Sequence, residues 1–238
     1  MIGCGRKLGP YDCCTVVCGD CLELMKSLPD GCVDAVITDP PYNARKDYGQ
    51  GTDNLSWSVY SGWIADCIIQ MESVSRGPVL VFLSVNGLLE VVPVKRPRHV
   101  CAWNKPMSFS PRLGGSAFLP HWEPCLVYGK VWGEGGRVPD YHLPDVWNFN
   151  PAQRNGHPCP KPEPLLDFLV AAIPAETILD PFLGSGTTAV AAKKLGRHFL
   201  GFEISLEYCK IAEERIALVE AQPNLFQPKA KQLSLGKE

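Results

Sequence analysis

The chain has 238 residues, of which 45% are hydrophobic and 20% charged, with a formal net charge of −2. That length is enough for one large α/β domain with a proper core, and the near-neutral charge excludes a global basic field that would attract nucleic acid. No apolar run reaches the length of a membrane span, and residues 1–5 lack the apolar core of a signal peptide. We therefore expect a cytoplasmic protein without membrane partners.

The 11 cysteines are an odd number, which argues against a disulfide framework and for a reducing compartment. Cys18 and Cys21 have C-x-x-C spacing, but no second such pair follows and no histidine precedes His99. A zinc site normally needs one or the other. We interpret the cysteines as small apolar packing residues and expect no metal.

Apolar runs bounded by turn residues alternate between strand-like and helix-like patterns. In the first half of the chain they predict a strand over 15–18, a helix over 21–28, a strand over 33–38, a helix over 61–73, a strand over 78–84 and a helix over 85–92. Strands over 100–104 and 125–128 follow. In the remainder they predict a helix over 165–173, a strand over 177–179, a helix over 188–195, a strand over 198–202 and a helix over 206–221. The stretch 106–162 is rich in proline and glycine, so we expect most of it to be irregular and to lie outside the sheet.

Near-continuous apolar strands separated by helices predict an α/β fold with a parallel sheet covered on both faces. Such sheets bind ligands at the carboxyl ends of their strands. Asp20, Asp39, Asp180 and Glu203 each stand at such an end. We expect these four carboxylates to share one edge of the sheet.

Gly184-Ser185-Gly186-Thr187 follows a strand and precedes a helix. Glycines there let the backbone approach a ligand, and the helix N-terminus offers free N–H groups. Glu203 closes the next strand, 17 residues after Gly186, where nucleotide-binding folds place an acid that accepts hydrogen bonds from ribose hydroxyls. The loop lacks the Gly-Lys-Ser/Thr ending of a phosphate loop, so a ligand with ribose but no pyrophosphate, S-adenosyl-L-methionine, fits better.

The order of these motifs resembles that of the DNA amino-methyltransferases of the circularly permuted β group, over roughly residues 14–221. The family has a Rossmann-like methyltransferase sheet. The segments that carry the resemblance are Cys18-Gly19-Asp20, Thr38-Asp39-Pro40-Pro41-Tyr42-Asn43, Trp103-Asn104-Lys105, His157-Pro158-Cys159-Pro160-Lys161-Pro162, Asp180–Thr188 and Arg197–Ser205.

The resemblance implies that Glu203 holds the ribose of the cofactor, Asp20 its adenine amine, and Lys161 with its helix the methionine end. It divides the chain into a catalytic half (1–106), a target-recognition insertion (107–156), a cofactor-binding half (157–221) and a flexible tail (222–238). The whole cofactor set that we expect is Asp20, Cys21, Lys161, Asp180, Phe182, Gly184, Ser185, Gly186, Thr187, Glu203 and Ile204.

Asp39, Pro40, Pro41 and Tyr42 are the predicted catalytic residues. An exocyclic base amine is a poor nucleophile, because its lone pair is delocalised into the ring. The Asp39 carboxylate and the Pro40 carbonyl can accept hydrogen bonds from its two N–H groups, since two prolines present carbonyls in a stiff turn. Tyr42 offers a ring on which the base stacks. A duplex base must leave the helix to reach such a pocket, so we expect base flipping.

Double-stranded DNA is the expected partner, with the segment 44–57 near the flipped base and 107–156 as the recognition region. A homodimer would supply more DNA surface than one chain. The tail segments 222–226 and 232–235 resemble peptides that dock on bacterial sliding clamps. The residues that we expect to contact DNA are Asn43, Arg45, Lys46, Lys105, Arg112 and Arg154.

Within the family, an aspartate at the first motif position is commoner for N6-adenine and a serine for N4-cytosine, so Asp39 favours adenine. An N4-cytosine DNA methyltransferase is the alternative, and an enzyme acting on RNA or on a protein amide a more distant one. Protein-amide enzymes with a related motif keep the cofactor loop first, and this chain does not. A DNA-binding regulator that lost turnover is the non-enzymatic alternative.

Overall fold

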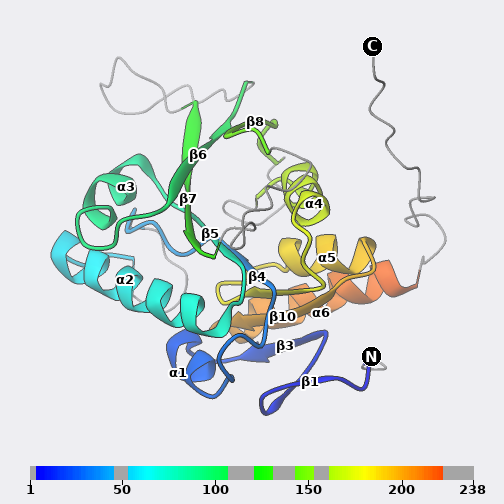
Figure 1. The fold of residues 1–238 in the computed structure, drawn as a ribbon. Coiled ribbons are helices and arrows are strands. Elements are labelled where there is room, and N and C mark those ends of the chain that lie inside the picture. The colour runs from blue at the N-terminus through cyan, green and yellow to red at the C-terminus, as the bar shows by residue number, and fades with distance from the viewer. Residues whose placement is uncertain (1–3, 46–52, 107–120, 131–142, 153–160, 222–238) are drawn as a thin grey trace.

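Figure 1 shows the fold of the chain in a computed structural model, which describes residues 4–45, 53–106, 121–130, 143–152 and 161–221. The strands are β1 (Lys7–Leu8), β2 (Tyr11–Asp12), β3 (Thr15–Cys18), β4 (Ala35–Thr38), β5 (Pro78–Phe82), β6 (His99–Asn104), β7 (Trp122–Gly129), β8 (Val146–Asn148), β9 (Thr177–Asp180) and β10 (His198–Glu203). The helices are α1 (Cys21–Lys26), α2 (Trp57–Val74), α3 (Val85–Val91), α4 (Glu163–Ala172), α5 (Thr187–Lys194) and α6 (Leu206–Glu220).

Eight strands form one sheet in the order β3-β10-β9-β4-β5-β7-β6-β8, and β1 and β2 form a separate hairpin. The strands from β3 to β5 pair in parallel, whereas β7 runs antiparallel to both β5 and β6. Two strands from the C-terminal part of the chain, β10 and β9, therefore lie between β3 and β4 from its N-terminal part. This interleaving joins the two halves of the chain in a single sheet.

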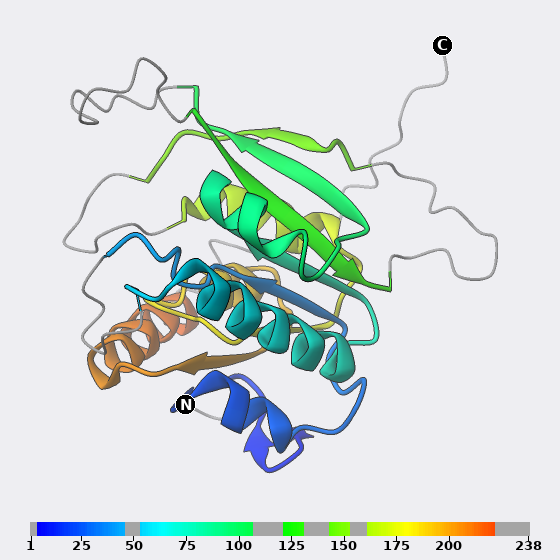
Figure 2. The same cartoon turned by 90° about the vertical axis from the view of Figure 1, so that its left-hand side faces the viewer.

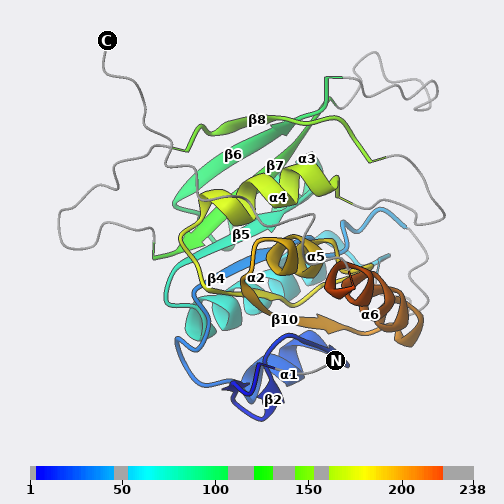
Figure 3. The same ribbon diagram turned by 90° about the vertical axis from the view of Figure 1, so that its right-hand side faces the viewer.

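Helices cover both faces of the sheet because successive strand residues point to opposite faces. In β4, for example, Ala35 and Ile37 join one buried cluster and Val36 joins the other. The first cluster includes residues of α4, α5 and α6, which face the viewer in Figure 3. The second includes residues of α1, α2 and α3, and Figure 2 shows α2 and α3 in front of the sheet. The fold is thus a three-layer α/β sandwich.

The expected α/β fold is confirmed, and each predicted strand and helix is present with ends shifted by a few residues. Two segments of the stretch 106–162, which we expected to lie mostly outside the sheet, join it: β7, predicted as a strand over 125–128, lies in its interior, and β8, which was not predicted, lies at an edge. Their apolar residues Cys125 and Trp147 are buried, which explains why these strands join the core. Sequence patterns also missed the short β1–β2 hairpin.

Within the described ranges, no helix is long and apolar enough to span a bilayer. The predicted tail, 222–238, lies outside the described residues.

Candidate active site at the carboxyl edge of the sheet

The four expected carboxylates lie along one edge of the sheet. Because β3, β10, β9 and β4 are neighbours and parallel, their carboxyl ends present Asp20, Glu203, Asp180 and Asp39 in that spatial order. Strands in a sheet are separated by about 4.8 Å, so this row spans roughly 14 Å. The glycine turn at 184–186 follows β9, the strand beside Asp39. The expectation that the two motifs share one edge is confirmed.

The Asp39–Tyr42 motif, predicted to be catalytic, directly contacts Lys161, from the segment predicted to bind the cofactor. Lys161, which precedes α4, places its Nζ 2.7 Å from Asp39 Oδ2, 3.1 Å from Glu123 Oε2 and 2.8 Å from the Tyr42 hydroxyl. Its side chain is only 9% exposed. The ammonium is also 5.1 Å from the centres of the Tyr42 and Phe82 rings, a distance at which cation–π attraction contributes. Lys161 is therefore the centre of a buried polar cluster.

Glu123 and Lys105 complete this cluster, and Glu123 is a residue that sequence reasoning missed. Lys105 Nζ lies 2.9 Å from Glu123 Oε1, so Glu123 bridges the two lysines. Burial opposes ionisation of Glu123, but the ammonium groups of Lys161 and Lys105 outweigh burial and lower its pKa to about 2. With Asp39, the cluster holds two carboxylates and two ammonium groups, which gives a formal charge of zero.

Asp39 keeps one oxygen without a partner. Its Oδ2 pairs with Lys161, whereas no described residue donates a hydrogen bond to its buried Oδ1. Burial raises the pKa of Asp39, the nearby Glu123 adds to this shift, and the Lys161 ammonium opposes it. A buried carboxylate oxygen without a donor is costly, which makes Asp39 Oδ1 a candidate acceptor for a donor on a ligand.

The carbonyls of the two prolines differ in a way that matters for a ligand. The Pro41 carbonyl accepts a hydrogen bond of 2.8 Å from the Tyr60 hydroxyl. Within the described part of the chain, no group donates to the Pro40 carbonyl. The Tyr42 hydroxyl is fixed between Lys161 and Glu123, to which it donates a hydrogen bond of 3.2 Å. The motif thus holds two buried acceptors, Asp39 Oδ1 and the Pro40 carbonyl, that have no donor among the described residues.

The glycine turn needs its glycines for two separate reasons. Gly184 and Gly186 have φ values of 55° and 84°, in the left-handed region that side chains disfavour. A Cβ on Gly186 would also lie 2.8 Å from the Cβ of Ala212 in α6. The turn therefore packs closely against α6 and begins α5 with its backbone free of side chains.

Glu203 is held by backbone N–H groups. Its Oε2 accepts a hydrogen bond of 2.7 Å from Gly184 N, and its Oε1 accepts one of 2.9 Å from Ser205 N. Burial raises its pKa, and these two donors oppose the shift. Each carboxylate oxygen has further lone pairs, so the group can still accept hydrogen bonds from a ligand.

Asp180 links the two motifs from inside the protein. It is 4% exposed, and its Oδ1 accepts hydrogen bonds from the Thr38 hydroxyl at 2.7 Å and from Phe182 N at 3.1 Å. Burial raises its pKa to about 6, although these donors and the Thr188 hydroxyl oppose the shift. Thr38 precedes Asp39, so Asp180 connects the end of β4 to the turn that follows β9.

Arg215 of α6 is a second residue that sequence reasoning missed. One of its nitrogens donates to the Ser185 carbonyl at 2.6 Å and hydroxyl at 3.0 Å and to the Thr187 hydroxyl at 3.3 Å. The other donates to Glu163 Oε1 at 2.8 Å. The expected cofactor residues Ser185 and Thr187 are buried, and Arg215 engages both of their hydroxyls. Arg215 therefore anchors the turn to both α6 and α4.

The remaining expected cofactor residues lie around the same edge. Asp20 caps α1, since its Oδ1 accepts hydrogen bonds from Leu22 N and Glu23 N. Cys21 is the buried first residue of α1, and Ile204 is 40% exposed just after β10. The ring of Phe182 packs edge-on against another ring, that of Trp63, at 5.6 Å.

The residues that we expected to contact DNA lie in different environments. Lys105 does not fit a phosphate contact, because its side chain is 11% exposed and paired with Glu123. Asn43 holds Leu55 with both amide atoms, at 2.9 and 2.8 Å, and so closes the intervening loop. Arg45 has a left-handed backbone with φ of 58°. Lys46, Arg112 and Arg154 lie outside the described residues.

Comparison with known proteins shows the family to which this chain belongs. Residues 126–214 match the model of a DNA methylase family, N6_N4_Mtase. The chain is 30% identical to the methylase YubD of Escherichia coli over 89% of its own length and 97% of that protein. It is 31% identical to the type II methyltransferase M.ScaI of Streptomyces caespitosus, over 86% of its own length and 81% of that protein. The chain belongs to the N6/N4 DNA amino-methyltransferase family.

Solved structures show the same methyltransferase fold. A DNA modification methylase from Thermus thermophilus, complexed with S-adenosyl-L-methionine, superimposes with a TM-score of 0.64 at 23% identity, over 86% of this chain and 93% of that one. The cytosine-N4-specific PvuII DNA methyltransferase also gives a TM-score of 0.64, at 18% identity over 89% and 93%. Chains that are less than a quarter identical to this one thus share its fold.

Proposed function

We propose that this DNA methyltransferase transfers a methyl group from S-adenosyl-L-methionine to the N6 amine of an adenine that has left the duplex. The observation that carries the proposal is the buried, unpartnered Oδ1 of Asp39, next to a β-strand that leads into a glycine turn. An amine N–H is the donor that this oxygen lacks.

The residues of the cofactor side suit a nucleoside. Glu203 retains lone pairs for ribose hydroxyls while two backbone N–H groups hold it in place. Gly184 and Gly186 adopt left-handed conformations and leave the turn without side chains at these positions, so a ligand can approach its backbone closely. S-adenosyl-L-methionine, when bound here, supplies a methyl group on a sulfonium. Asp20 lies beyond Glu203 in the row, which suits the adenine end, and Asp39 lies at the opposite end.

Two acceptors position the target amine. Asp39 Oδ1 and the Pro40 carbonyl each accept one N–H, which draws the amine lone pair out of conjugation and toward the methyl group. Lys161 opposes the effect of burial on Asp39 and so favours the carboxylate that this role requires. After transfer, the extra amine proton leaves to Asp39 or to water. Alignment of the two reactants supplies much of the rate acceleration.

Tyr42 gives the flipped base a stacking surface. Hydrogen bonds to Lys161 and Glu123 fix its hydroxyl, so the ring does not have to be ordered when the base arrives. Stacking on an aromatic ring contributes about 1–3 kcal/mol per base. The preorganised ring supports base flipping as the route by which the amine reaches Asp39.

Labelled methyl incorporation into DNA, followed by mass spectrometry of the nucleosides, tests the proposal. We expect N6-methyladenine, and a loss of at least about 100-fold in rate for Asp39→Ala. Asp66→Ala is the matched control, because Asp66 is an exposed acid on α2.

Other products would redirect the proposal. N4-methylcytosine would overturn the choice of adenine while leaving the site intact. DNA binding without methyl incorporation would favour a regulator without turnover. Turnover in Asp39→Ala equal to that of the unchanged protein would disprove the role of the carboxylate.

A further inference from the structure

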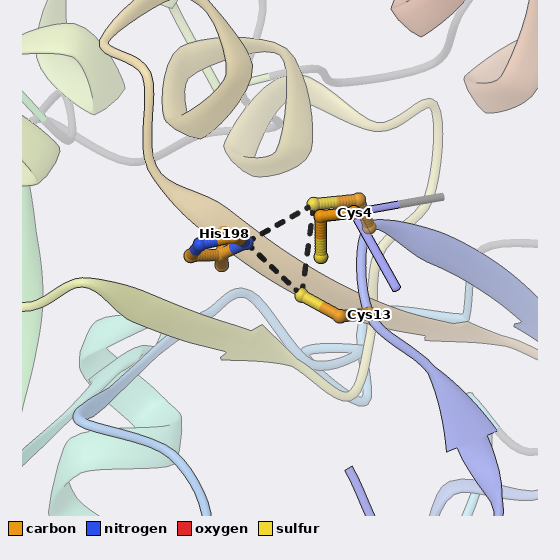
Figure 4. Close-up of side chains that lie close together, drawn as sticks. Cys4, Cys13 and His198 are labelled. Carbon is orange, nitrogen blue, oxygen red and sulfur yellow. Dashed lines mark hydrogen bonds between the residues drawn. The ribbon is translucent and has the colours of Figure 1, made fainter. Parts of the chain in front are cut away.

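Three cysteines and one histidine converge at the amino end of β10, outside the site described above. The ligand atoms of Cys4, Cys13, Cys14 and His198 all lie within 4.8 Å of one another. Figure 4 shows the side chains of Cys4, Cys13 and His198 pointing toward a common centre. His198 is 184 residues from Cys14 in sequence, so only folding brings it to the cysteines.

The backbone arranges these side chains through an uncommon conformation. Consecutive residues in an extended chain point to opposite sides. Cys14 instead has a φ of 63°, in the left-handed region that residues other than glycine rarely adopt. Its Sγ thereby lies 3.7 Å from that of Cys13. Such outliers persist where the surroundings require them, often at functional sites.

Main-chain hydrogen bonds hold the pieces in register. Cys14 N donates to the Phe199 carbonyl at 2.7 Å, and Cys13 N donates to the Arg6 carbonyl at 2.9 Å. His198 N donates to the Glu176 carbonyl at 2.7 Å. The cysteine pair is therefore fixed to β10 on one side and to the segment that carries Cys4 on the other.

The spacing of the ligand atoms matches a tetrahedral metal site. With Zn–S bonds of about 2.3 Å and Zn–N bonds of about 2.0–2.1 Å, the edges of a tetrahedron are about 3.8 Å between sulfurs and about 3.5 Å between sulfur and nitrogen. The Cys13–Cys14 separation is 3.7 Å, and the His198 Nδ1 lies 3.2 Å from Cys13 Sγ and 3.6 Å from Cys14 Sγ. Cys4 Sγ lies within 4.8 Å of each of these three atoms, about 1 Å or less beyond a tetrahedral edge, so it can serve as the fourth ligand.

We propose that Cys4, Cys13, Cys14 and His198 bind one zinc ion in a structural Cys₃His site. Three soft thiolates with one imidazole select zinc over magnesium or calcium, and four protein ligands leave no open position for chemistry. Each thiol loses its proton when the metal binds, and His198 donates the lone pair of its neutral Nδ1. The C-x-x-C pair is separate: the Cys18 thiol donates to the Ile204 carbonyl at 3.7 Å.

The site is placed to secure the start of the chain. His198 and Glu203 are the first and last residues of β10, so at about 3.3 Å per residue the metal lies roughly 16 Å from the cofactor edge. The β1–β2 hairpin has strands of only two residues each. A metal that links Cys4 and the Cys13–Cys14 pair to β10 would fasten this hairpin to the sheet. It would also fix the approach to β3, whose end carries Asp20.

Metal analysis of the full chain, purified with reducing agent and then desalted, tests the proposal. We expect about one zinc per chain by elemental mass spectrometry. Replacement by cobalt should give the intense visible absorption of a tetrahedral centre and the near-ultraviolet bands of thiolate-to-cobalt charge transfer. Cys13→Ser and His198→Gln should each lower zinc affinity at least about tenfold, as is typical when a ligand is removed. Cys32→Ser, which changes a half-buried cysteine outside the cluster, should bind zinc like the unchanged protein.

Three results would overturn the inference. The first is an unchanged protein that takes up neither zinc nor cobalt. The second is full zinc retention in both Cys13→Ser and His198→Gln. The third is a disulfide among Cys4, Cys13 and Cys14 in the purified protein, found by mass mapping. If a variant fails to fold, the cobalt spectrum of the unchanged protein still decides, because cobalt without thiolate ligands lacks the charge-transfer bands.

Discussion

Asp39 and Glu203 lie on the same edge of the sheet, yet the protein holds the two carboxylates in different ways. Glu203 accepts backbone hydrogen bonds from Gly184 and Ser205, and no described cation lies beside it. Asp39 pairs with the Lys161 ammonium through one oxygen, and its second oxygen is buried without a donor among the described residues. The first carboxylate is held by backbone N–H groups, whereas the second depends on the side chain of Lys161, which Glu123 also contacts.

This difference follows from what each group is proposed to do. A ribose-binding carboxylate needs only a fixed position and free lone pairs, which backbone donors provide without further titrating groups. A carboxylate that holds a reacting amine must also stay ionised in a buried site. The neutral cluster of Asp39, Glu123, Lys161 and Lys105 meets that need, because each carboxylate faces an ammonium.

Lys161→Met tests the pairing of Asp39 with an ammonium group and should have the largest effect. It leaves Asp39 and Glu123 without their shared ammonium, which should destabilise the protein by about 3–5 kcal/mol. The pKa of Asp39, already raised by burial, should rise further. Since activity requires the carboxylate, the acidic limb of the pH–rate profile should move to higher pH. Denaturant unfolding and a pH series of methyl incorporation measure both effects.

Two companion variants separate the contributions to this result. Lys105→Met leaves Lys161 in place and should shift the acidic limb less. Lys161→Met leaves the cluster with a formal charge of −1, and adding Glu123→Gln returns it to zero, which should recover part of the lost stability. An acidic limb that stays at the same pH in Lys161→Met would show that Asp39 is not the titrating group.

Glu203→Gln tests the carboxylate that backbone N–H groups hold. The glutamine amide cannot accept both backbone hydrogen bonds that the carboxylate accepts, and it offers a weaker partner to ribose hydroxyls. We expect cofactor affinity to fall about 10–100-fold, or about 1.4–2.7 kcal/mol. The rate at saturating cofactor should change little, because Asp39 is untouched. Calorimetric titration and saturation kinetics distinguish this from a loss in rate alone, which would contradict the assignment.

Asp180→Asn tests the residue that connects the Asp39 strand to the glycine turn. The test measures how the stability of the protein depends on pH. The pKa of Asp180 is raised to about 6 in the folded protein, so the folded state binds the proton more tightly than the unfolded chain. The contribution of this group to stability is therefore full at low pH and is lost as pH rises from about 4 through 6. Asparagine removes that loss while its oxygen can still accept from Thr38 and Phe182.

The variant should thus gain stability relative to the unchanged protein between pH 4 and pH 8, by on the order of 2 kcal/mol. Thermal unfolding at a series of pH values measures this gain. Parallel stability curves for the two proteins would mean that Asp180 does not titrate in this range.

Arg215→Met should have the smallest effect, because it acts through the position of the glycine turn. Loss of its hydrogen bonds to Ser185 and Thr187 should raise the KM for the cofactor about fivefold to tenfold, with kcat nearly unchanged. Lys210→Met, an exposed position on the same helix, is the control. An equal change in both variants would point to a general effect on α6 instead of on the turn.

Much of the fold was predictable because its signals are local. Apolar runs such as 35–38 and 177–180 lie between turn residues, and each is buried as a strand. Glu123 gave no such signal: it is one acid near the start of a strand, and its importance comes from Lys105 and Lys161, which lie 18 and 38 residues away. The same holds for Arg215 and for the pairing of His198 with three cysteines.

The amino-acid sequence by itself determined that acids and glycines end several parallel strands, because hydrophobic periodicity and turn chemistry are properties of neighbouring residues. Only the tertiary structure decided which of those groups became paired, buried or left open. Charge pairing, burial and ligand geometry depend on distances between segments far apart in the chain. In this protein those distances are set by the interleaving of β4, β9 and β10 in one sheet.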